Sequence, residues 1–369
     1  MSQLKVNAIS DAAGANGNAI TLATDGTCTA KVTNNLSNRN LITNGSCIVA
    51  QRATQKTTHT GHGYFTVDRI YTSIGGENEG RTEDQIALTA SDTGPWEKGF
   101  RNSFQITNGN QTSVDNGDYQ YLLYRVEAQD IATSGWDYTS SSSYITLSFW
   151  LKSSVAQTFY GYLRTDDGTK KYYSFNTGAL SANTWTKITK TIPGASGIQI
   201  NNDTGVGLDI VLYAYAGGDY TFSITEEAWA SWNSGARTRT QTSTWWETDN
   251  ATFAITGLQL EVGHATDFEH RSYADELARC QRYYEAIYMN AGTNGFQSAT
   301  SYGGQVSNNI FAVTKRAKPT FSLEGNATWV GATPNVFTDP HNFIFHHGST
   351  AYALSDGDQD LCGSFSAEL

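Results

Sequence analysis

Polar and apolar residues alternate with a period of two along much of this chain, which is the pattern of half-buried β-strands. The alternation is clearest in residues 144–152, where the apolar positions are Ile145, Leu147, Phe149 and Leu151. Comparable segments follow at regular spacing, at residues 119–127, 158–164, 171–175, 184–192 and 208–215. Asp166, Asp167 and Gly168 predict a hairpin turn between two of them, because aspartate and glycine tolerate positive φ angles. Many strands separated by turns predict an antiparallel, jelly-roll-like β-sandwich.

The sharpest pattern lies in residues 251–287, where a strand, a short connection and a helix follow one another. Phe253 and Ile255 share one parity and Leu258 shares the other with Leu260 and Val262, so we expect a β-bulge at Gly257. Ser272 is placed to cap the helix, with Asp275 in the capping-box position. A 4-3-4-3 spacing then predicts one buried helix face, formed by Tyr273, Leu277, Cys280, Tyr284 and Ile287. We expect this face to contact either the sandwich of the same chain or the same helix in neighbouring subunits.

Chain length and the place of this helix predict the domain organisation. A chain of 369 residues exceeds the length that one hydrophobic core usually serves. We therefore predict a mainly β protein with a short β-rich arm at 1–40, a sandwich at 41–271, a connecting helix at 272–289 and a smaller C-terminal β-domain at 290–369. The last of these is a candidate tip.

Charge and composition exclude several classes of function. The net charge of −11 argues against nucleic acid as a partner, because phosphate contacts need clustered lysine and arginine. The four cysteines, Cys28, Cys47, Cys280 and Cys362, have no CxxC spacing, so we expect reduced and mostly buried thiols. No segment reaches the roughly 20 apolar residues that span a bilayer, and the N-terminus has no apolar signal region. We expect a soluble protein made in a cytoplasm, without membrane insertion.

The segment 257–286 resembles a group of bacteriophage tail-fibre and other virion proteins that contain a carbohydrate-binding-like β-sandwich. The resemblance rests on a QLE-x-G element, a T-x-FE-x-R element and an EL-x-x-CQRYY element in this order. The matching residues are Gln259, Leu260, Glu261, Gly263, Thr266, Phe268, Glu269, Arg271, Glu276, Leu277, Cys280, Gln281, Arg282, Tyr283 and Tyr284. The sequence departs from the pattern at Asp267 and His270. Residues 40–52, residues 63–71 and the run VTKRAKPTFS are also similar to segments of this group.

The resemblance implies a part of a virion tail, made in the cytoplasm of a bacterial host. It implies a homotrimer, contacts between the N-terminal arm and other tail proteins, and attachment to a glycan or another receptor on the host surface. Two alternatives remain open. One is a decoration or head-fibre protein without receptor binding, and the other is a polysaccharide depolymerase.

A tryptophan-rich segment at residues 226–247 is the candidate saccharide site. Flat aromatic side chains stack on sugar rings, and neighbouring arginines can donate hydrogen bonds to hydroxyl groups. The candidate residues are Trp229, Trp232, Arg237, Arg239, Trp245 and Trp246. The competing interpretation is that these tryptophans fill the core or a subunit contact, because large aromatic side chains dominate burial energetics.

Sequence motifs of catalysis are missing from the chain. It contains no GxSxG, HExxH, P-loop or EF-hand pattern, so we expect binding without catalysis and assign no catalytic residue and no cofactor. His341, His346 and His347 could bind a metal ion across a three-fold axis. We expect instead surface or interface histidines, and assign no metal ligand.

Overall fold

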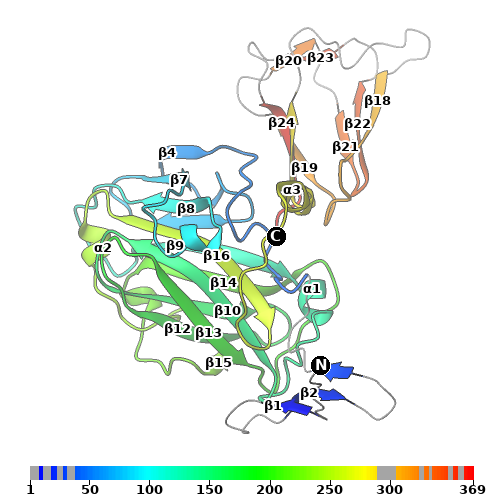
Figure 1. Cartoon of the computed structure of the whole chain (residues 1–369). Coiled ribbons are helices and arrows are strands. Elements are labelled where there is room, and N and C mark those ends of the chain that lie inside the picture. The colour runs from blue at the N-terminus through cyan, green and yellow to red at the C-terminus, as the bar shows by residue number, and fades with distance from the viewer. Residues whose placement is uncertain are drawn as a thin grey trace.

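The computed structural model describes residues 38–288 without a gap, residues 8–10, 18–22 and 28–30 before them, and residues 305–323, 328–331, 335–347, 352–355 and 361–369 after them. Within these ranges antiparallel strands form most of the regular structure, and the helices are short (Figure 1). The expected mainly β fold is therefore confirmed. No helix in the described part of the chain is long and apolar enough to cross a membrane.

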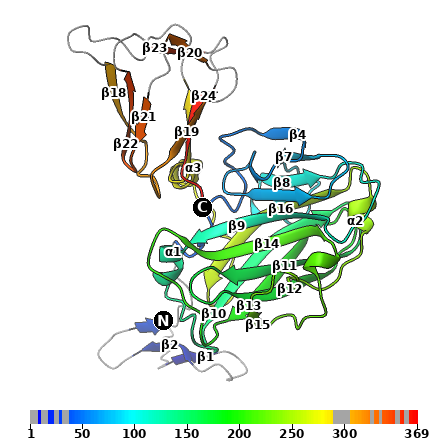
Figure 2. The ribbon, with the colours of Figure 1, turned by 180° about the vertical axis from the view of Figure 1, so that it is seen from behind.

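Two antiparallel sheets form the body of the molecule. The six-stranded sheet has the order β13-β10-β16-β8-β7-β4. Its strands are β4 (Gln55–His59), β7 (Arg81–Ala87), β8 (Asn102–Thr107), β10 (Tyr144–Ser153), β13 (Thr186–Pro193) and β16 (Thr252–Val262). The seven-stranded sheet has the order β15-β12-β11-β14-β9-β6-β5 (Figure 2). Its strands are β5 (Gly63–Tyr64), β6 (Tyr71–Gly75), β9 (Tyr119–Glu127), β11 (Thr158–Thr165), β12 (Lys171–Ala179), β14 (Val206–Ala216) and β15 (Trp229–Ser231).

The main core lies between these two sheets and follows the predicted alternation. Ile145, Leu147, Phe149 and Leu151 of β10 are all buried in it, as the sequence pattern predicts. Strands β7 and β8 were not predicted. In β7 the inward positions include Arg81 and Glu83, which are fully buried as an ion pair with Nε and Oε1 at 2.8 Å. A charged pair at core positions removes the apolar signal by which a strand is recognised.

The predicted bulge at Gly257 is confirmed. The register between β10 and β16 shifts between Ser148 and Trp150, and Gly257 has a φ of 65°. Because one extra residue stands on β16, Phe253 and Leu258 have opposite parity and still enter the same core.

The helices are α1 (Ala128–Ala132), α2 (Thr244–Glu247) and α3 (Tyr273–Gln281), with single 3-10 turns at Trp96–Lys98 and Gly218–Tyr220. Helix α3 is capped as predicted, because the Ser272 hydroxyl accepts a hydrogen bond from the Asp275 N–H at 3.2 Å. Its predicted extent to residue 289 is wrong. The chain turns at Arg282 and continues as β17 (Tyr284–Tyr288), where alternating tyrosine and isoleucine favour a strand.

The predicted helix face changes with this boundary. Cys280 is buried and Leu277 is half-buried, but Tyr273 is 56% exposed. Tyr284 is buried as part of β17 and not of the helix. Ile287 is also in β17, and its side chain lies outside the described part of the structure. The continuous five-residue helix face is therefore wrong, because its apolar positions extend across a helix, a turn and a strand.

Smaller sheets precede the sandwich in the chain, and others follow helix α3. The C-terminal sheets have the orders β17-β24-β19, β18-β22-β21 and β20-β23. Their remaining strands are β18 (Gln305–Ile310), β19 (Thr320–Leu323), β20 (Thr328–Gly331), β21 (Asn335–Thr338), β22 (Asn342–His347), β23 (Tyr352–Ser355) and β24 (Leu361–Ser366). The N-terminal sheet consists of β1 (Ala8–Ser10), β2 (Asn18–Leu22) and β3 (Cys28–Ala30). The N-terminal and C-terminal sheets lie on opposite sides of the sandwich (Figure 1).

Cys47 and Cys280 are free and buried, as expected. The side chains of Cys28 and Cys362 lie outside the described part of the structure.

Candidate functional site

The outer face of the seven-stranded sheet is covered with tyrosines. Strand alternation explains their position: in β14, Ile210 and Leu212 point into the main core, so Val211 and Tyr213 point away from it. Neighbouring strands carry aromatic residues with the same orientation, which brings their rings together. We call this surface the tyrosine face, and its strand residues are Tyr71, Tyr119, Tyr121, Tyr160, Tyr162, Tyr172 and Tyr213.

The rings of the tyrosine face contact one another across the strands. Tyr121 of β9 stands opposite Tyr213 of β14 in the register, with ring centroids 5.3 Å apart. The ring centroids of Tyr162 of β11 and Tyr213 are 6.2 Å apart. Tyr213 is fully buried, and burial raises its pKa to about 12, so it stays a neutral hydrogen-bonding group at ordinary pH. The aromatic surface is thus continuous across three strands.

A row of charges borders these rings. Arg125, Asp209 and Arg164 stand side by side on β9, β14 and β11. Asp209 Oδ1 lies 3.5 Å from Arg125 Nε, and Asp209 Oδ2 accepts a hydrogen bond from Arg164. Burial raises the pKa of Asp209, while the two guanidinium groups oppose this shift. The face therefore combines apolar rings with fixed hydrogen-bonding groups.

The loop at residues 217–241 lies against one part of this face. Trp232 packs its ring 5.3 Å from that of Tyr162, and the guanidinium of Arg164 lies 4.8 Å from the Trp232 ring centroid. Arg237 Nη1 donates to the Tyr213 hydroxyl at 3.2 Å. The same guanidinium lies over the ring of Tyr220 at 4.5 Å. The loop thus adds aromatic and cationic groups to those supplied by the strands.

Several of these rings remain accessible to a ligand. Trp232, Tyr71, Tyr121 and Tyr160 are half-buried, and Phe222 in the same loop is 64% exposed. Half-buried rings on rigid strands present their faces at low cost in conformational entropy, and the nearby arginines can donate hydrogen bonds to hydroxyl groups. Rings beside hydrogen-bonding groups are the combination that a saccharide site needs.

The structure divides the predicted saccharide residues into two groups. Trp232 and Arg237 lie on the tyrosine face, and Arg239 is exposed and pairs with Glu226 at 3.7 Å. Trp245 and Trp246 are fully buried in the main core, where their indole N–H groups donate to backbone oxygens. Trp229 packs on the core edge and donates to the Pro193 oxygen at 2.6 Å. A saccharide role for Trp245 and Trp246 is therefore wrong, because the sandwich uses them as core, whereas for the half-buried Trp229 it stays a prediction.

The sequence analysis missed the tyrosines themselves. The signal was present in the segments YQYLLYRVE and LDIVLYAYA, where large polar aromatics occupy the positions that alternate with core residues. Solvent-facing strand positions usually carry small polar or charged residues, and a ring at several such positions on neighbouring strands indicates a binding surface.

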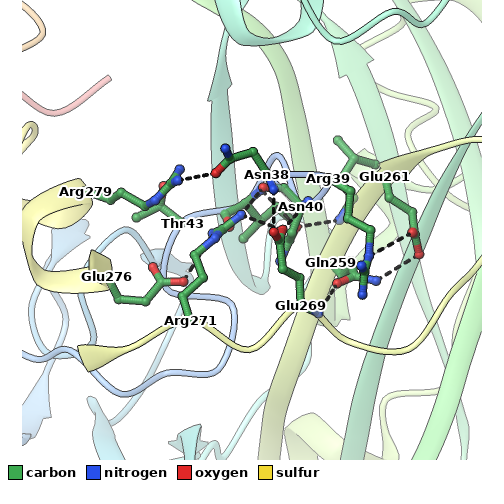
Figure 3. A network of polar contacts seen from close by, with 12 residues as sticks. Asn38, Arg39, Asn40, Thr43, Gln259, Glu261, Glu269, Arg271, Glu276 and Arg279 are labelled. Atoms are coloured by element: carbon green, nitrogen blue, oxygen red, sulfur yellow. Dashed lines mark hydrogen bonds and ion pairs between the residues drawn. The ribbon is translucent and has the colours of Figure 1, made fainter. Parts of the chain in front are cut away.

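The segments that carry the family resemblance form a different site. They come together between the sandwich, α3 and the C-terminal strands, in a network of buried polar groups. Figure 3 shows the part of this network around Arg271. We call this network the junction, and its residues are Asn40, Gln51, Arg52, Asp68, Arg69, Glu127, Gln259, Glu261, Glu269, Arg271, Glu276, Arg282 and Glu368.

Arg271 is central to one half of the junction. Its guanidinium donates to the backbone oxygens of Asn40 at 2.6 Å and Ile42 at 3.0 Å. It also pairs with Glu269 at 2.9 Å and Glu276 at 3.2 Å (Figure 3). Burial raises the pKa of Glu269, but the Asn40 N–H and Arg271 outweigh this and hold it below its ordinary value. These contacts fasten the start of the sandwich to the turn before α3.

The other half of the junction binds the C-terminus. Glu368 pairs with the buried Arg69 and lies 3.2 Å from Arg52. The two guanidinium groups stack on the rings of Tyr283 at 3.5 Å and Tyr284 at 3.6 Å. The motif residues thus hold distant chain segments together.

Metal ligands do not gather in the described part of the chain, where no three His, Cys, Asp or Glu side chains are placed to hold an ion. His341 is exposed, and the side chains of His346 and His347 lie outside the described part of the structure.

Comparisons with known proteins gave structural similarities alone. No protein-family model and no curated protein sequence matches the chain. The enzymatically active domain of tailspike protein 4 of bacteriophage CBA120 is similar with a TM-score of 0.32 and 10% identity, over 61% of this chain and 22% of that one.

Two further solved structures are similar at the same low level. The CBM22-2 xylan-binding domain of Paenibacillus barcinonensis Xyn10C has a TM-score of 0.27 and 16% identity, over 52% of this chain and 91% of that one. The baseplate tripod of bacteriophage Tuc2009 has a TM-score of 0.24 and 12% identity, over 73% of this chain and 81% of that one. Because all three scores are low, the functional argument rests on the side chains described above.

Proposed function

We propose that this chain is a bacteriophage tail-fibre protein that attaches the virion to saccharides on the host cell surface through the tyrosine face. The proposal joins the family resemblance of residues 257–286 to the surface chemistry of the sandwich. The chain acts by binding, without catalysis.

The observation that carries the proposal is the half-exposed aromatic surface beside the row formed by Arg125, Asp209 and Arg164. Sugar rings have apolar C–H faces and a rim of hydroxyl groups. Rings of Trp232 and Tyr121 offer flat surfaces to the former, and the partly exposed guanidinium groups of Arg125 and Arg164 offer donors to the latter.

Assembly strengthens weak binding in this proposal. A homotrimer displays three tyrosine faces, and the N-terminal arm joins them to other tail proteins. Single contacts in the millimolar range then produce stable attachment, because the second and third binding events occur at high effective concentration. Mass photometry of the full chain tests this step, and a monomer at micromolar concentration would contradict it.

The binding step is tested with Trp232→Ala on an array of bacterial surface glycans and in competition with virions for host cells. The wild-type chain is expected to bind and to compete, and Trp232→Ala is expected to lose at least about tenfold in affinity. Tyr144→Ala is the matched control, because Tyr144 is a 37% exposed aromatic residue on the other sheet. Equal binding by both variants would contradict the role of the tyrosine face.

These measurements and an assay of polysaccharide length separate the two alternatives. A trimeric chain that binds no glycan and does not compete for cells is a decoration protein. Shortening of a host polysaccharide by the purified chain, measured by size-exclusion chromatography, identifies a depolymerase.

A further inference from the structure

A cavity of about 420 Å³ lies on the opposite sheet, outside both the tyrosine face and the junction. Its lining comes from β10, β13, the bulge of β16 and the connections around residues 97–100 and 267–270. The volume falls within the range of small-molecule sites, which begins at roughly 300 Å³. We call it the Trp150 cleft, and the side chains used below are Glu97, Lys98, Phe100, Trp150, Lys187, Asp267, Phe268 and His270.

Two glycines with positive φ leave room for the Trp150 ring in this cleft. A Cβ atom on Gly94, whose φ is 94°, would stand 2.7 Å from the Trp150 ring. A Cβ atom on Gly257, the bulge residue, would stand 3.1 Å from the same ring and 2.7 Å from Phe100. Side chains at either position would collide with the indole, so the local backbone is shaped to accommodate it.

A second aromatic group forms another wall. Phe268 contacts Phe100 at a centroid distance of 4.8 Å and His270 at 4.9 Å. His270 Nε2 lies 2.8 Å from the Lys98 backbone oxygen, and because that oxygen can only accept, Nε2 carries the proton. This hydrogen bond fixes the imidazole, so the walls of the cleft exist before any ligand arrives.

The charged groups of the cleft balance one another. Two lysines, Lys98 and Lys187, face two carboxylates, Glu97 and Asp267, and all four residues are exposed. None of the four forms an ion pair with another residue of the described chain. The lining thus carries no formal net charge when His270 is neutral, and it offers both donors and acceptors that the fold does not use.

From this geometry we infer that the Trp150 cleft is a second carbohydrate-binding site, which takes a single neutral hexopyranose unit. The half-buried indole of Trp150 stacks on one face of the sugar ring. The lysines donate hydrogen bonds to its hydroxyl groups, and the carboxylates accept hydrogen bonds from them. Only a ligand that both donates and accepts hydrogen bonds can pair with all four groups. A uronic or sialic acid would be attracted by the two lysines and repelled by the two carboxylates, so its charge adds no net attraction.

The inference does not depend on the tyrosine face, and one experiment monitors ligand binding at the tyrosine face and at the Trp150 cleft separately. The full chain is labelled with 5-fluorotryptophan, and ¹⁹F NMR spectra are recorded during titration with methyl α-glucoside, methyl α-galactoside, methyl α-mannoside and, as an acidic probe, glucuronic acid. The sequence contains nine tryptophans. Trp150→Phe and Trp232→Phe assign the two resonances of interest.

The expected result is a saturable shift of the Trp150 resonance with at least one neutral hexoside and no comparable shift with glucuronic acid. Lys187→Ala should weaken this titration about fivefold or more and leave the spectrum of the free protein otherwise unchanged. Lys56→Ala is the control, because Lys56 is an exposed lysine of β4 in the same sheet, outside the cleft.

The outcomes are distinct. A Trp150 resonance that responds to none of the neutral sugars overturns the inference, whatever Trp232 does. Selective response to glucuronic acid overturns the argument from charge balance. Loss of the response in Lys187→Ala but not in Lys56→Ala supports the site, even when the Trp232 resonance is silent and the proposed function fails.

Discussion

The junction and the tyrosine face both contain arginine–carboxylate pairs, but the surroundings of these pairs differ. In the junction, the side chains of Arg271 and Glu276 are 7% and 3% exposed, and the arginine also donates to backbone oxygens of a distant segment. On the tyrosine face, Arg164 and Arg125 are 22% and 26% exposed and lie beside half-buried rings. Buried charges that bind backbone hold the fold together, whereas partly exposed charges on rigid strands remain available to a ligand.

The strongest test of this comparison is Arg271→Ala. The substitution leaves Glu269 and Glu276 without their cation and two backbone oxygens without a donor. We expect the free energy of unfolding to fall by about 3–5 kcal/mol, as for other broken buried ion pairs. Urea denaturation followed by tryptophan fluorescence measures the loss.

Arg239→Ala is the matched control, because Arg239 forms a 3.7 Å pair with Glu226 while its side chain is 51% exposed. Its effect should stay within about 0–1 kcal/mol. Similar losses for the two arginines would contradict the distinction between buried and exposed pairs.

The second test compares two tryptophans of one segment. Trp246→Ala removes a fully buried side chain and should lower the free energy of unfolding by about 3–5 kcal/mol. Trp232→Ala removes a half-buried side chain and should cost roughly 1 kcal/mol while saccharide binding is lost. Thermal unfolding and glycan binding measured on both variants give the result, and a stable Trp246→Ala protein that no longer binds glycan would reverse the assignment.

These two tryptophans show how far the sequence could predict the site. Both lie in one polar, aromatic-rich segment, and its composition does not tell which ring enters the core. That choice depends on Tyr215 and the backbone oxygen of Ser113, which contact Trp246 from distant positions in the chain. The tyrosine face was missed for a related reason, since its rings come from five strands and form no contiguous motif.

The fold was easier to predict where local rules decide the structure. The alternation of polar and apolar residues predicted β9 and β10, and its change of phase predicted the bulge at Gly257. Ser272 predicted the start of α3. Local rules failed at the end of α3. There the pairing of Tyr284 with Ser366 of β24 prevails over a helical spacing of apolar residues, and that partner lies far along the chain.

The third test uses pH. Burial raises the pKa of Asp68 from 3.8 to about 6, although Arg52 and Gln51 oppose the shift. A carboxyl group whose pKa is raised on folding retains its proton in the folded state between about pH 4 and pH 6. The folded state therefore loses stability as pH rises through this window, by up to about 3 kcal/mol.

Asp68→Asn removes this titration, since an amide does not ionise. The stability of the wild-type chain relative to Asp68→Asn should decrease from pH 4 to pH 6 and stay level above pH 7. Denaturant midpoints of both proteins across this range measure the difference. A difference that is independent of pH, or that grows with pH, would contradict the burial of this carboxyl group in the junction.

The smallest loss of stability is expected from Ser272, whose substitution tests whether the cap of helix α3 or the buried ion network stabilises the junction. Ser272→Ala removes the capping hydrogen bond from the Asp275 N–H to the serine hydroxyl, and the one from that hydroxyl to Asp275 Oδ2, and should cost about 1 kcal/mol. Ser272→Asn is the control, because its amide oxygen can cap the same N–H and its amide N–H can donate to the Asp275 carboxylate. Hydrogen exchange of the α3 amides should accelerate in Ser272→Ala and not in Ser272→Asn. If the loss in Ser272→Ala equals that in Arg271→Ala, then helix formation and not the buried ion network stabilises the junction.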